Sequence, residues 1–256
     1  MHHFILPTQD SWISSGSLVK DKNFGGDGIL ELKKVFQNSS FEYQTQALVN
    51  FAGTDFTELS QSVSSGDVPS NAEYFLRLFE AEGTSELSEE YMLAAYPLFK
   101  SWVEGNGKSE DNPKTTNGVS WENRNDILNG SQISWSYTDG AKELALAGDL
   151  DRNGITFEEF HVAFGTSTQA FGSVTGSDFL GGNDSDDMGG VWINRAGYIA
   201  SQSFSSEPAD VEMNVTDMVN KWINGQADNY GMILKFSGSQ ETNSTTYGHL
   251  KFFARE

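Results

Sequence analysis

The sequence predicts an all-β protein, and two observations support that prediction. Over residues 41–51 the odd positions hold Phe41, Tyr43, Thr45, Ala47, Val49 and Phe51, while Glu42, Gln44, Gln46 and Asn50 lie between them. This alternation is typical of a half-buried strand with one solvated face. The second observation is a set of glycine-rich turn signals at residues 23–28, 105–107 and 181–183. Many short strands joined by such turns favour a β-sandwich.

Seven further segments have strand patterns: residues 4–8, 29–35, 73–81, 133–137, 211–215, 230–236 and 249–254. Residues 73–81 carry apolar side chains on both faces, which predicts a central strand. Residues 88–103 fit two interpretations. The glutamates and leucines suit a helix that Pro97 would break, and the part from Tyr96 onward also suits a strand.

One short helix is predicted at about residues 216–224. Thr216 is expected to cap its N-terminus, and Asp217 in the first turn complements the helix dipole. Trp222 belongs to the apolar stripe that would pack on the sandwich, and Gly225 follows where a left-handed residue ends many helices. The helix is only about three turns long, so packing must stabilise it.

The domain organisation predicted is a single β-sandwich domain over residues 1–256. A chain of 256 residues could also form two small domains, and length alone does not decide. Neither a linker nor an internal repeat divides the sequence. Residues of about 139–190 are glycine-rich, acidic and weakly patterned, which indicates a loop-rich insertion carried by the sandwich.

The charge balance disfavours two classes of partner. With 36 acidic against 16 basic residues the net charge is −20, which repels phosphate backbones and anionic membrane surfaces. We therefore expect neither a nucleic-acid nor a membrane partner. No secretory signal pattern opens the sequence, so the chain either is not exported by that route or is a mature form. Cysteine is absent, which excludes disulfides and thiolate sites.

No catalytic motif is apparent, and we expect a protein that is not an enzyme and has no cofactor. There are four histidines, and no nucleophile elbow, zinc-protease motif or phosphate loop occurs. Adjacent carboxylates such as Glu158 and Glu159 are frequent in so acidic a chain. A hydrolase with two carboxylates across a cleft stays an alternative, because sequence does not reveal their separation.

The one candidate metal site is a calcium loop at Asp149, Asp151 and Asn153, followed by Gly154. These residues match the early ligand positions of an EF-hand loop. A residue is missing after Gly154, which displaces the expected bidentate glutamate to Glu159. An Asx-rich turn that leads into a strand is the favoured interpretation. The acidic run at residues 183–187 is likewise interpreted as a solvated loop rather than as a cation site.

Four tryptophans allow two interpretations: Trp12, Trp121, Trp135 and Trp192. Exposed, they would form a platform for sugar rings. Tryptophan in a β-sandwich is more often part of the core, and periodicity does not separate the two cases.

Several segments resemble DNRLRE-type β-sandwich domains, of the kind found in virion structural proteins of tailed phages. They include the Asn-Phe-Gly-Gly-Asp-Gly turn at residues 23–28, the capped helix and following strand at 210–235, and the Phe-Phe-Ala-Arg-Glu segment within 247–256. The resemblance covers residues 1–137 and 205–256, and it is poor over the insertion. It implies a jelly-roll-like sandwich and supplies no catalytic residues.

The resemblance also implies one more strand after residue 256. A sandwich without it would have unpaired backbone groups at the edge beside residues 249–254. We expect a partner, or a second copy of the chain, to supply that strand by β-augmentation.

The function expected from these observations is that of a structural or attachment protein of a tailed-phage virion, in the neck, tail or fibre. Its partners would be other virion proteins, copies of itself and a cell-surface glycan, and it would assemble in the host cytoplasm. The alternative is a carbohydrate-binding or adhesion module of a secreted bacterial protein, located outside the cell.

Overall fold

The computed structural model describes residues 4–37, 40–82, 90–127, 131–135, 180–181, 189–194, 196–205, 210–241, 243 and 248–255. Its strands are β1 (Pro7–Ser14), β2 (Ile29–Gln37), β3 (Ser40–Phe51), β4 (Phe75–Leu78), β5 (Glu80–Glu82), β6 (Glu90–Pro97), β7 (Asn123–Ile127), β8 (Ser131–Ser134), β9 (Leu180–Gly181), β10 (Trp192–Ile193), β11 (Ala200–Ser205), β12 (Val211–Asn214), β13 (Met232–Phe236) and β14 (His249–Phe253). The helices are α1 (Gly53–Ser65) and α5 (Thr216–Ile223), and η1 (Gly238–Glu241) is a 3₁₀ turn.

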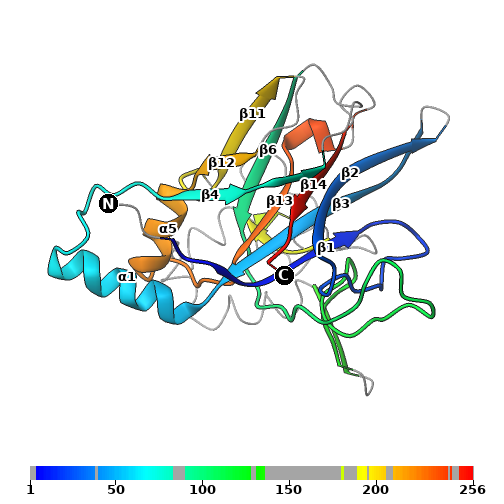
Figure 1. Ribbon diagram of the computed structural model, residues 1–256, viewed down its shortest axis with the longest axis horizontal. Coiled ribbons are helices and arrows are strands. Elements are labelled where there is room, and N and C mark those ends of the chain that lie inside the picture. Colours follow the sequence, from blue (N-terminus) through cyan, green and yellow to red (C-terminus); the bar gives the residue numbers. More distant parts are fainter. Residues whose placement is uncertain are drawn as a thin grey trace, which may run out of the picture.

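The described strands form a curled antiparallel sheet, which confirms the all-β, sandwich-like prediction. Its order is β11-β6-β13-β3-β2-β14-β5, and β1 pairs with the second half of β3. Three two-stranded sheets accompany it: β12-β4, β10-β9 and β7-β8. Figure 1 shows the long β2 and β3 strands projecting from one end of the molecule, while both helices lie at the other. The core is built from side chains of this sheet, among them Ile13, Leu32, Leu48, Leu93, Ile233 and Phe252.

The long strand β3 begins and ends almost where the alternation predicts, but its faces differ from the prediction. From Thr45 to Val49 every residue is buried, so the centre of the strand has no solvated face. Gln46, expected to face water, is only 1% exposed. Its side-chain amide is instead in the interior, where it donates to Glu241 of η1 at 2.8 Å. The strands β13 and β1 pair along the two edges of this part of β3.

Three strand predictions need correction. The first strand is β1, which starts at Pro7 and continues to Ser14 rather than ending at residue 8. The segment 73–81 is not a central strand, because it divides into β4, which pairs with β12, and β5, which pairs with β14. Residues 90–97 form strand β6 between β11 and β13, so the helical interpretation of residues 88–103 is wrong.

The edge expected to lack a strand is already occupied. β14 pairs with β2 from His249 to Phe253, and on its other side Lys251 and Phe252 pair with β5. Both sides of β14 therefore have backbone partners within the same chain. The expectation that a partner strand completes the sheet beside β14 is wrong.

Helix α5 agrees with the predicted helix, except at its cap. The N-cap residue is Val215, and the Thr216 hydroxyl accepts a hydrogen bond from the Tyr74 N–H at 2.9 Å instead of capping its own helix. Trp222 is buried as expected, and Gly225 has the predicted left-handed conformation with φ +66°. Helix α1 was not predicted. No helix in the described residues is long and apolar enough to span a membrane.

The two helices meet through aromatic rings. Phe56 of α1 packs edge-on against Trp222 of α5 with ring centroids 5.3 Å apart, and the Ser60 hydroxyl donates to the Ile223 carbonyl at 3.1 Å. Phe56 is the one buried residue of α1, and the attachment of the helix extends to Leu59 and Ser60 in its middle.

A buried amide joins the segment before β2 to the long connection between β6 and β7. Asn23 is 0% exposed, and all four of its side-chain hydrogen-bonding positions are used. Its Nδ2 donates to the carbonyls of Glu104 and Val119 at 2.6 and 2.7 Å. Its Oδ1 accepts from the N–H groups of Gly25 and Gly107 at 3.2 and 2.8 Å. We call this set of contacts the Asn23 hub.

The hub requires glycine because the two segments are in backbone contact. A Cβ on Gly25 would lie 2.1 Å from the Glu104 carbonyl oxygen. A Cβ on Gly107 would lie 2.5 Å from the Asn23 carbonyl oxygen. Within the β6–β7 connection itself, Gly105 has φ +81°, which favours glycine. The glycine-rich turn signals of the sequence therefore mark close backbone approach as well as turns.

A second buried polar group, the η1 cluster, consists of Lys34, Gln44, Gln46, Lys235 and Glu241. The Lys235 ammonium forms an ion pair with Glu241 and lies 4.0 Å from the centroid of the Trp192 ring. The other Glu241 oxygen accepts hydrogen bonds from both glutamine amides at 2.8 Å. Burial lowers the pKa of Lys235, and the Glu241 carboxylate opposes that shift.

We expect Asn23→Ala to destabilise the protein by about 3 kcal/mol, because four backbone groups lose their partner, two of them on the buried residues Gly107 and Val119. Urea unfolding would measure the change. Asn106→Ala is the matched control, since Asn106 is exposed on the same connection. Equal effects of the two substitutions would contradict the hub's role.

Glu241→Leu is expected to destabilise by about 3–5 kcal/mol, because it leaves the Lys235 ammonium buried without its counter-ion. The double substitution Lys235→Met with Glu241→Leu should recover part of this loss, because it removes the unpaired ammonium but leaves the two glutamine amides without their acceptor. Chemical denaturation of the three proteins would check both statements. A single variant as stable as the parent would refute the first.

Candidate binding groove

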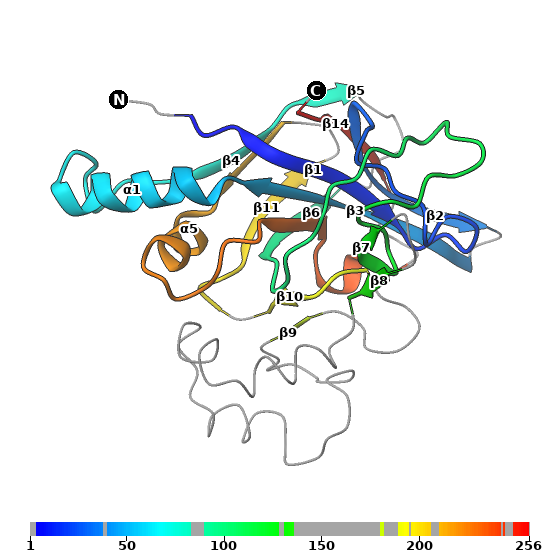
Figure 2. The same ribbon diagram turned by 90° about the horizontal axis from the view of Figure 1, so that it is seen from below.

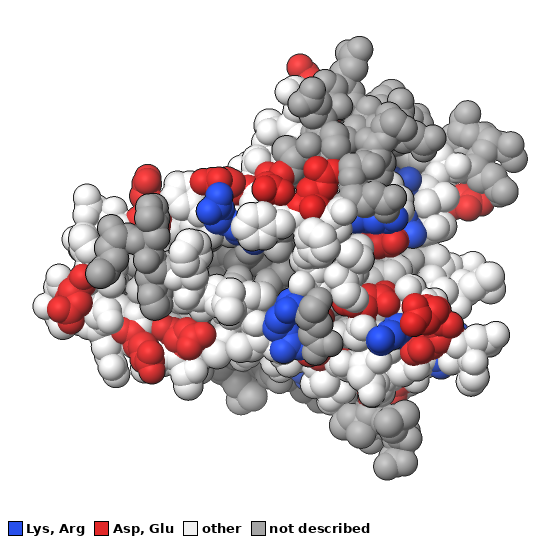
Figure 3. Space-filling view, viewed as in Figure 1, with Lys and Arg blue, Asp and Glu red and all other residues white. Residues whose placement is uncertain are grey.

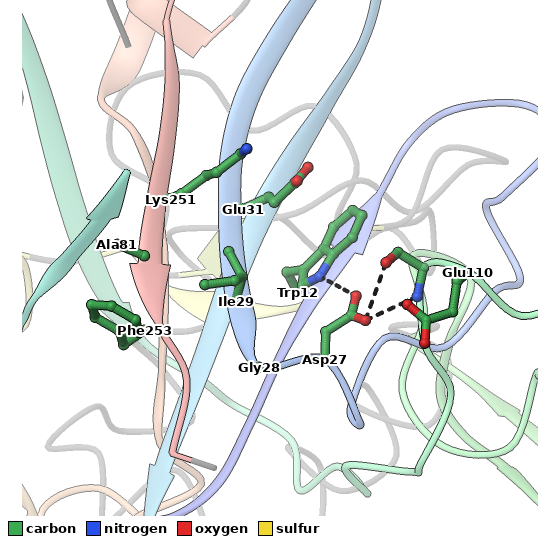
Figure 4. Close-up of a pocket in the computed structure, with 10 residues that line it drawn as sticks. Trp12, Asp27, Gly28, Ile29, Glu31, Ala81, Glu110, Lys251 and Phe253 are labelled. Carbon is green, nitrogen blue, oxygen red and sulfur yellow. Dashed lines mark hydrogen bonds between the residues drawn. The ribbon is translucent and has the colours of Figure 1, made fainter. Parts of the chain in front are cut away.

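An open groove lies where β1, β2 and β14 meet the β6–β7 connection, and it encloses about 470 Å³. Figure 4 shows its lining residues. They are Trp12, Asp27, Gly28, Ile29, Glu31, Ala81, Ser109, Glu110, Lys251 and Phe253. The first and last of these residues are more than 240 positions apart, so only the folded sheet brings them together.

Asp27 lies toward the β6–β7 connection in the groove, and hydrogen bonds fix its carboxylate. Its Oδ2 accepts a hydrogen bond from the Trp12 indole N–H at 3.0 Å. Its Oδ1 accepts from the N–H and the hydroxyl of Ser109 at 2.9 and 3.2 Å. Trp12 is itself fixed by stacking on Phe24, with ring centroids 3.7 Å apart. These contacts give the Asp27 carboxylate one orientation.

Glu31 lies on the β2 side of the groove, and neighbouring residues stabilise its negative charge. Lys33 donates to it at 2.6 Å, and His249 Nε2 lies 3.5 Å away, too far for a well-formed hydrogen bond. Burial alone raises the pKa of Glu31, but the polar contacts and positive charges of His249 and Lys33 outweigh burial and hold that pKa at about 2. Glu31 is therefore ionised at neutral pH.

One end of the groove is apolar. Phe253, in the last position of β14, is 57% exposed, and its ring lies beside Ala81 in Figure 4. Ile29 continues this surface toward Asp27. An exposed aromatic ring at a concave site offers a flat face for an apolar surface of a ligand.

The other end is formed by the β6–β7 connection, which the preceding segment holds in place. The Gly26 N–H donates to the Gly107 carbonyl at 2.8 Å, and the Lys22 ammonium donates to the carbonyls of Ser109 and Asp111 at 2.8 and 3.2 Å. Glu110 lies on this connection and is exposed. Within the described part of the chain, no donor or cation is paired with its carboxylate.

The predicted metal ligands are not among the groove residues. Asp149, Asp151 and Asn153 lie outside the described residues, as do most of the predicted insertion at 139–190 and the acidic run at 183–187. Within the part of the chain that is described, no three histidine or carboxylate side chains are close enough to hold a metal ion.

The tryptophans belong to the core. Trp12, Trp121, Trp135 and Trp192 are at most 8% exposed, so the sugar-platform interpretation of these four residues is wrong. The Trp135 indole, for example, donates to the Ser120 carbonyl at 2.9 Å in the interior. The exposed aromatic residue of the groove is Phe253, which the sequence places in a strand without indicating its exposure.

The low pKa of Glu31 makes stability depend on pH. Its carboxylate contributes fully above about pH 4.5, the ordinary pKa, and the contribution is lost as the pH falls toward 2. Glu31→Gln should remove roughly 1–3 kcal/mol of the decline in unfolding free energy over this window. Urea unfolding at several acidic pH values would measure it, with the exposed Glu58→Gln as the control for removing one carboxylate. Parallel pH profiles of the parent and Glu31→Gln would refute the assignment.

Comparison with known proteins gives no match that indicates a function. No protein-family model matches the chain, and no curated protein matches it significantly. The resemblance to DNRLRE-type domains therefore stays a sequence-based hypothesis.

Proposed function

We propose that this chain is a non-enzymatic attachment protein and that its groove binds a glycan. The observation that carries the proposal is the combination, in one concave site, of the exposed Phe253 ring with carboxylates at fixed positions. Sugar rings present C–H groups on one face and hydroxyl donors at the rim. An aromatic face and carboxylate acceptors are complementary to those two features.

The arrangement of the groove supports an extended ligand. Phe253, Ala81 and Ile29 form the apolar end, while Asp27, Ser109 and Glu110 form the polar end. A ligand that reaches both ends would stack on Phe253 and donate hydrogen bonds to Glu110. Asp27 already accepts three hydrogen bonds, so Glu110 is the acceptor with capacity to spare.

The setting we propose is a tailed-phage virion, where the chain would be a structural or attachment component. The support is the resemblance of residues 210–235 to DNRLRE-type domains and of residues 247–256 to the versions of that domain found in virion proteins. A secreted bacterial adhesion module is the alternative setting, and the groove is compatible with both.

Phe253→Ala is expected to reduce glycan binding at least tenfold, because the stacking surface is lost. A glycan array followed by titration of the strongest glycan would measure this. Phe75→Ala is the matched control: Phe75 is 46% exposed on β4, outside the groove. A chain that binds no glycan on the array, or that loses binding equally in both variants, would contradict the proposal.

The virion setting has its own test. Purified virions of the phage that encodes this chain should contain it in stoichiometric amounts by mass spectrometry. Its absence from the particle would refute the virion setting and leave the adhesion alternative.

A further inference from the structure

We infer that a cross-strand isopeptide bond forms between Lys235 Nζ and the side-chain carbonyl carbon of Gln46, with release of ammonia, and that Glu241 transfers the protons. The inference is independent of the proposed glycan site. It rests on how the η1 cluster places these three side chains relative to one another.

Lys235 and Gln46 lie at neighbouring positions of two paired strands. In the antiparallel register of β13 and β3, Leu234 lies opposite Ala47. Lys235 and Gln46 are the next residues of that register. Side chains directly opposite each other in an antiparallel pair lie on one face of the sheet, with their Cβ atoms about 5 Å apart. The amine of a lysine can therefore reach the amide of a glutamine at this position.

The Glu241 carboxylate bridges the two reacting groups. Its Oε2 pairs with the Lys235 ammonium at 2.5 Å, and its Oε1 accepts a hydrogen bond from Gln46 Nε2 at 2.8 Å. One carboxyl group thus contacts both the amine that would attack and the amide nitrogen that would leave. The turn η1, which supplies Glu241, follows β13 and is the orange-red turn beside β3 in Figure 2. A carboxylate in this place can pass protons from one nitrogen to the other.

The two reacting side chains are withdrawn from solvent. Figure 3 shows charged side chains spread over one face of the molecular surface, whereas Lys235 is 5% exposed and Gln46 is 1% exposed. Lys235 Nζ lies 4.0 Å from the centroid of the Trp192 ring and 5.7 Å from that of the Tyr96 ring. Burial lowers the pKa of Lys235, and the Glu241 carboxylate opposes that shift. Burial therefore favours the neutral amine, which is the nucleophilic form.

Lys34 supplies the second positive charge of the η1 cluster. Its ammonium donates to the carbonyls of Gln240 and Asn243, on either side of Glu241 in the chain, so it holds the turn that carries Glu241. Burial lowers the pKa of Lys34 to about 8, which leaves it protonated at neutral pH. A positive charge in the cluster also stabilises the oxyanion that forms when the Gln46 carbonyl is attacked.

The reaction balances without an oxidant or a cofactor. Glu241 takes a proton from the Lys235 ammonium, and the neutral nitrogen attacks Cδ of Gln46. The new C–N bond forms, the C–Nε2 bond breaks, and Nε2 receives a proton through Glu241 and leaves as ammonia. Of the three ammonium protons, one stays on the new amide, one leaves with ammonia, and the third passes to solvent as Glu241 returns to its carboxylate. A buried ammonium is thereby replaced by a neutral amide, which is less costly to bury. Glu241 keeps Lys34 as its neighbouring cation.

The mass of the purified full chain is the direct test. Mass spectrometry of the denatured chain should give the sequence mass minus one ammonia molecule as the main species. Tryptic digestion should then yield a linked pair of peptides that joins Lys235 to Gln46. The full sequence mass, the loss of one water, or a loss of ammonia that maps to an asparagine would each overturn the inference.

Two conservative substitutions separate the roles of the side chains. Lys235→Arg keeps a positive charge beside Glu241 but removes the nucleophile, and Glu241→Gln keeps the shape but removes the proton carrier. Both variants should have their full sequence mass, with folding checked by circular dichroism. Glu58→Gln, on the exposed side of α1, should lose ammonia as the parent does. Loss of ammonia from folded Lys235→Arg would overturn the bond, and loss from folded Glu241→Gln would overturn the role of Glu241. If either variant does not fold, the linked peptide pair of the parent chain decides.

Discussion

The buried amide of Asn23 connects two segments that are more than 80 residues apart in the sequence. The amide carries two donors and two acceptor positions, and all four are hydrogen-bonded. It can therefore hold two loop segments in contact without leaving any of its own groups unpaired. Only glycine fits where the backbones of the two segments touch, at Gly25 and Gly107. The position of Asp27 and Glu110 relative to each other follows from this connection.

The molecule uses buried polar groups in two different ways. The Asn23 hub is neutral and joins backbone to backbone, whereas the η1 cluster buries the Lys235 ammonium beside the Tyr96 and Trp192 rings and pairs it with the Glu241 carboxylate. Charged pairs in an interior contribute little net stability unless every remaining polar atom is also satisfied. Within the η1 cluster Gln46 Oε1 has no hydrogen-bond partner, so this part of the core is stabilised less than its number of contacts implies.

The sequence was sufficient to predict most strands and one helix, because both have local patterns. Residues 41–51 alternate, and Gly225 ends α5 with the φ that its position required. The burial of Gln46 could not be predicted, since its side chain contacts Glu241 of η1, which lies 195 residues further along the chain. Helix α1 had a weak signal, Phe56, Leu59 and Val63 at helical spacing, among serines and threonines that are poor helix formers. The groove had no signal in the sequence, because Trp12, Ser109 and Phe253 come together only through tertiary structure.

The hydrogen bonds between residues 22–27 and residues 105–111 reduce the entropy that would be lost when a ligand binds. A loop that becomes ordered only on binding forfeits backbone conformational entropy, and that loss is subtracted from the affinity. Here hydrogen bonds from Lys22 and Gly26, and to Asp27, already fix the backbone that carries Ser109 and Glu110. The groove is therefore preorganised, and a ligand would need to immobilise little more than the rotamers of Glu110 and Phe253.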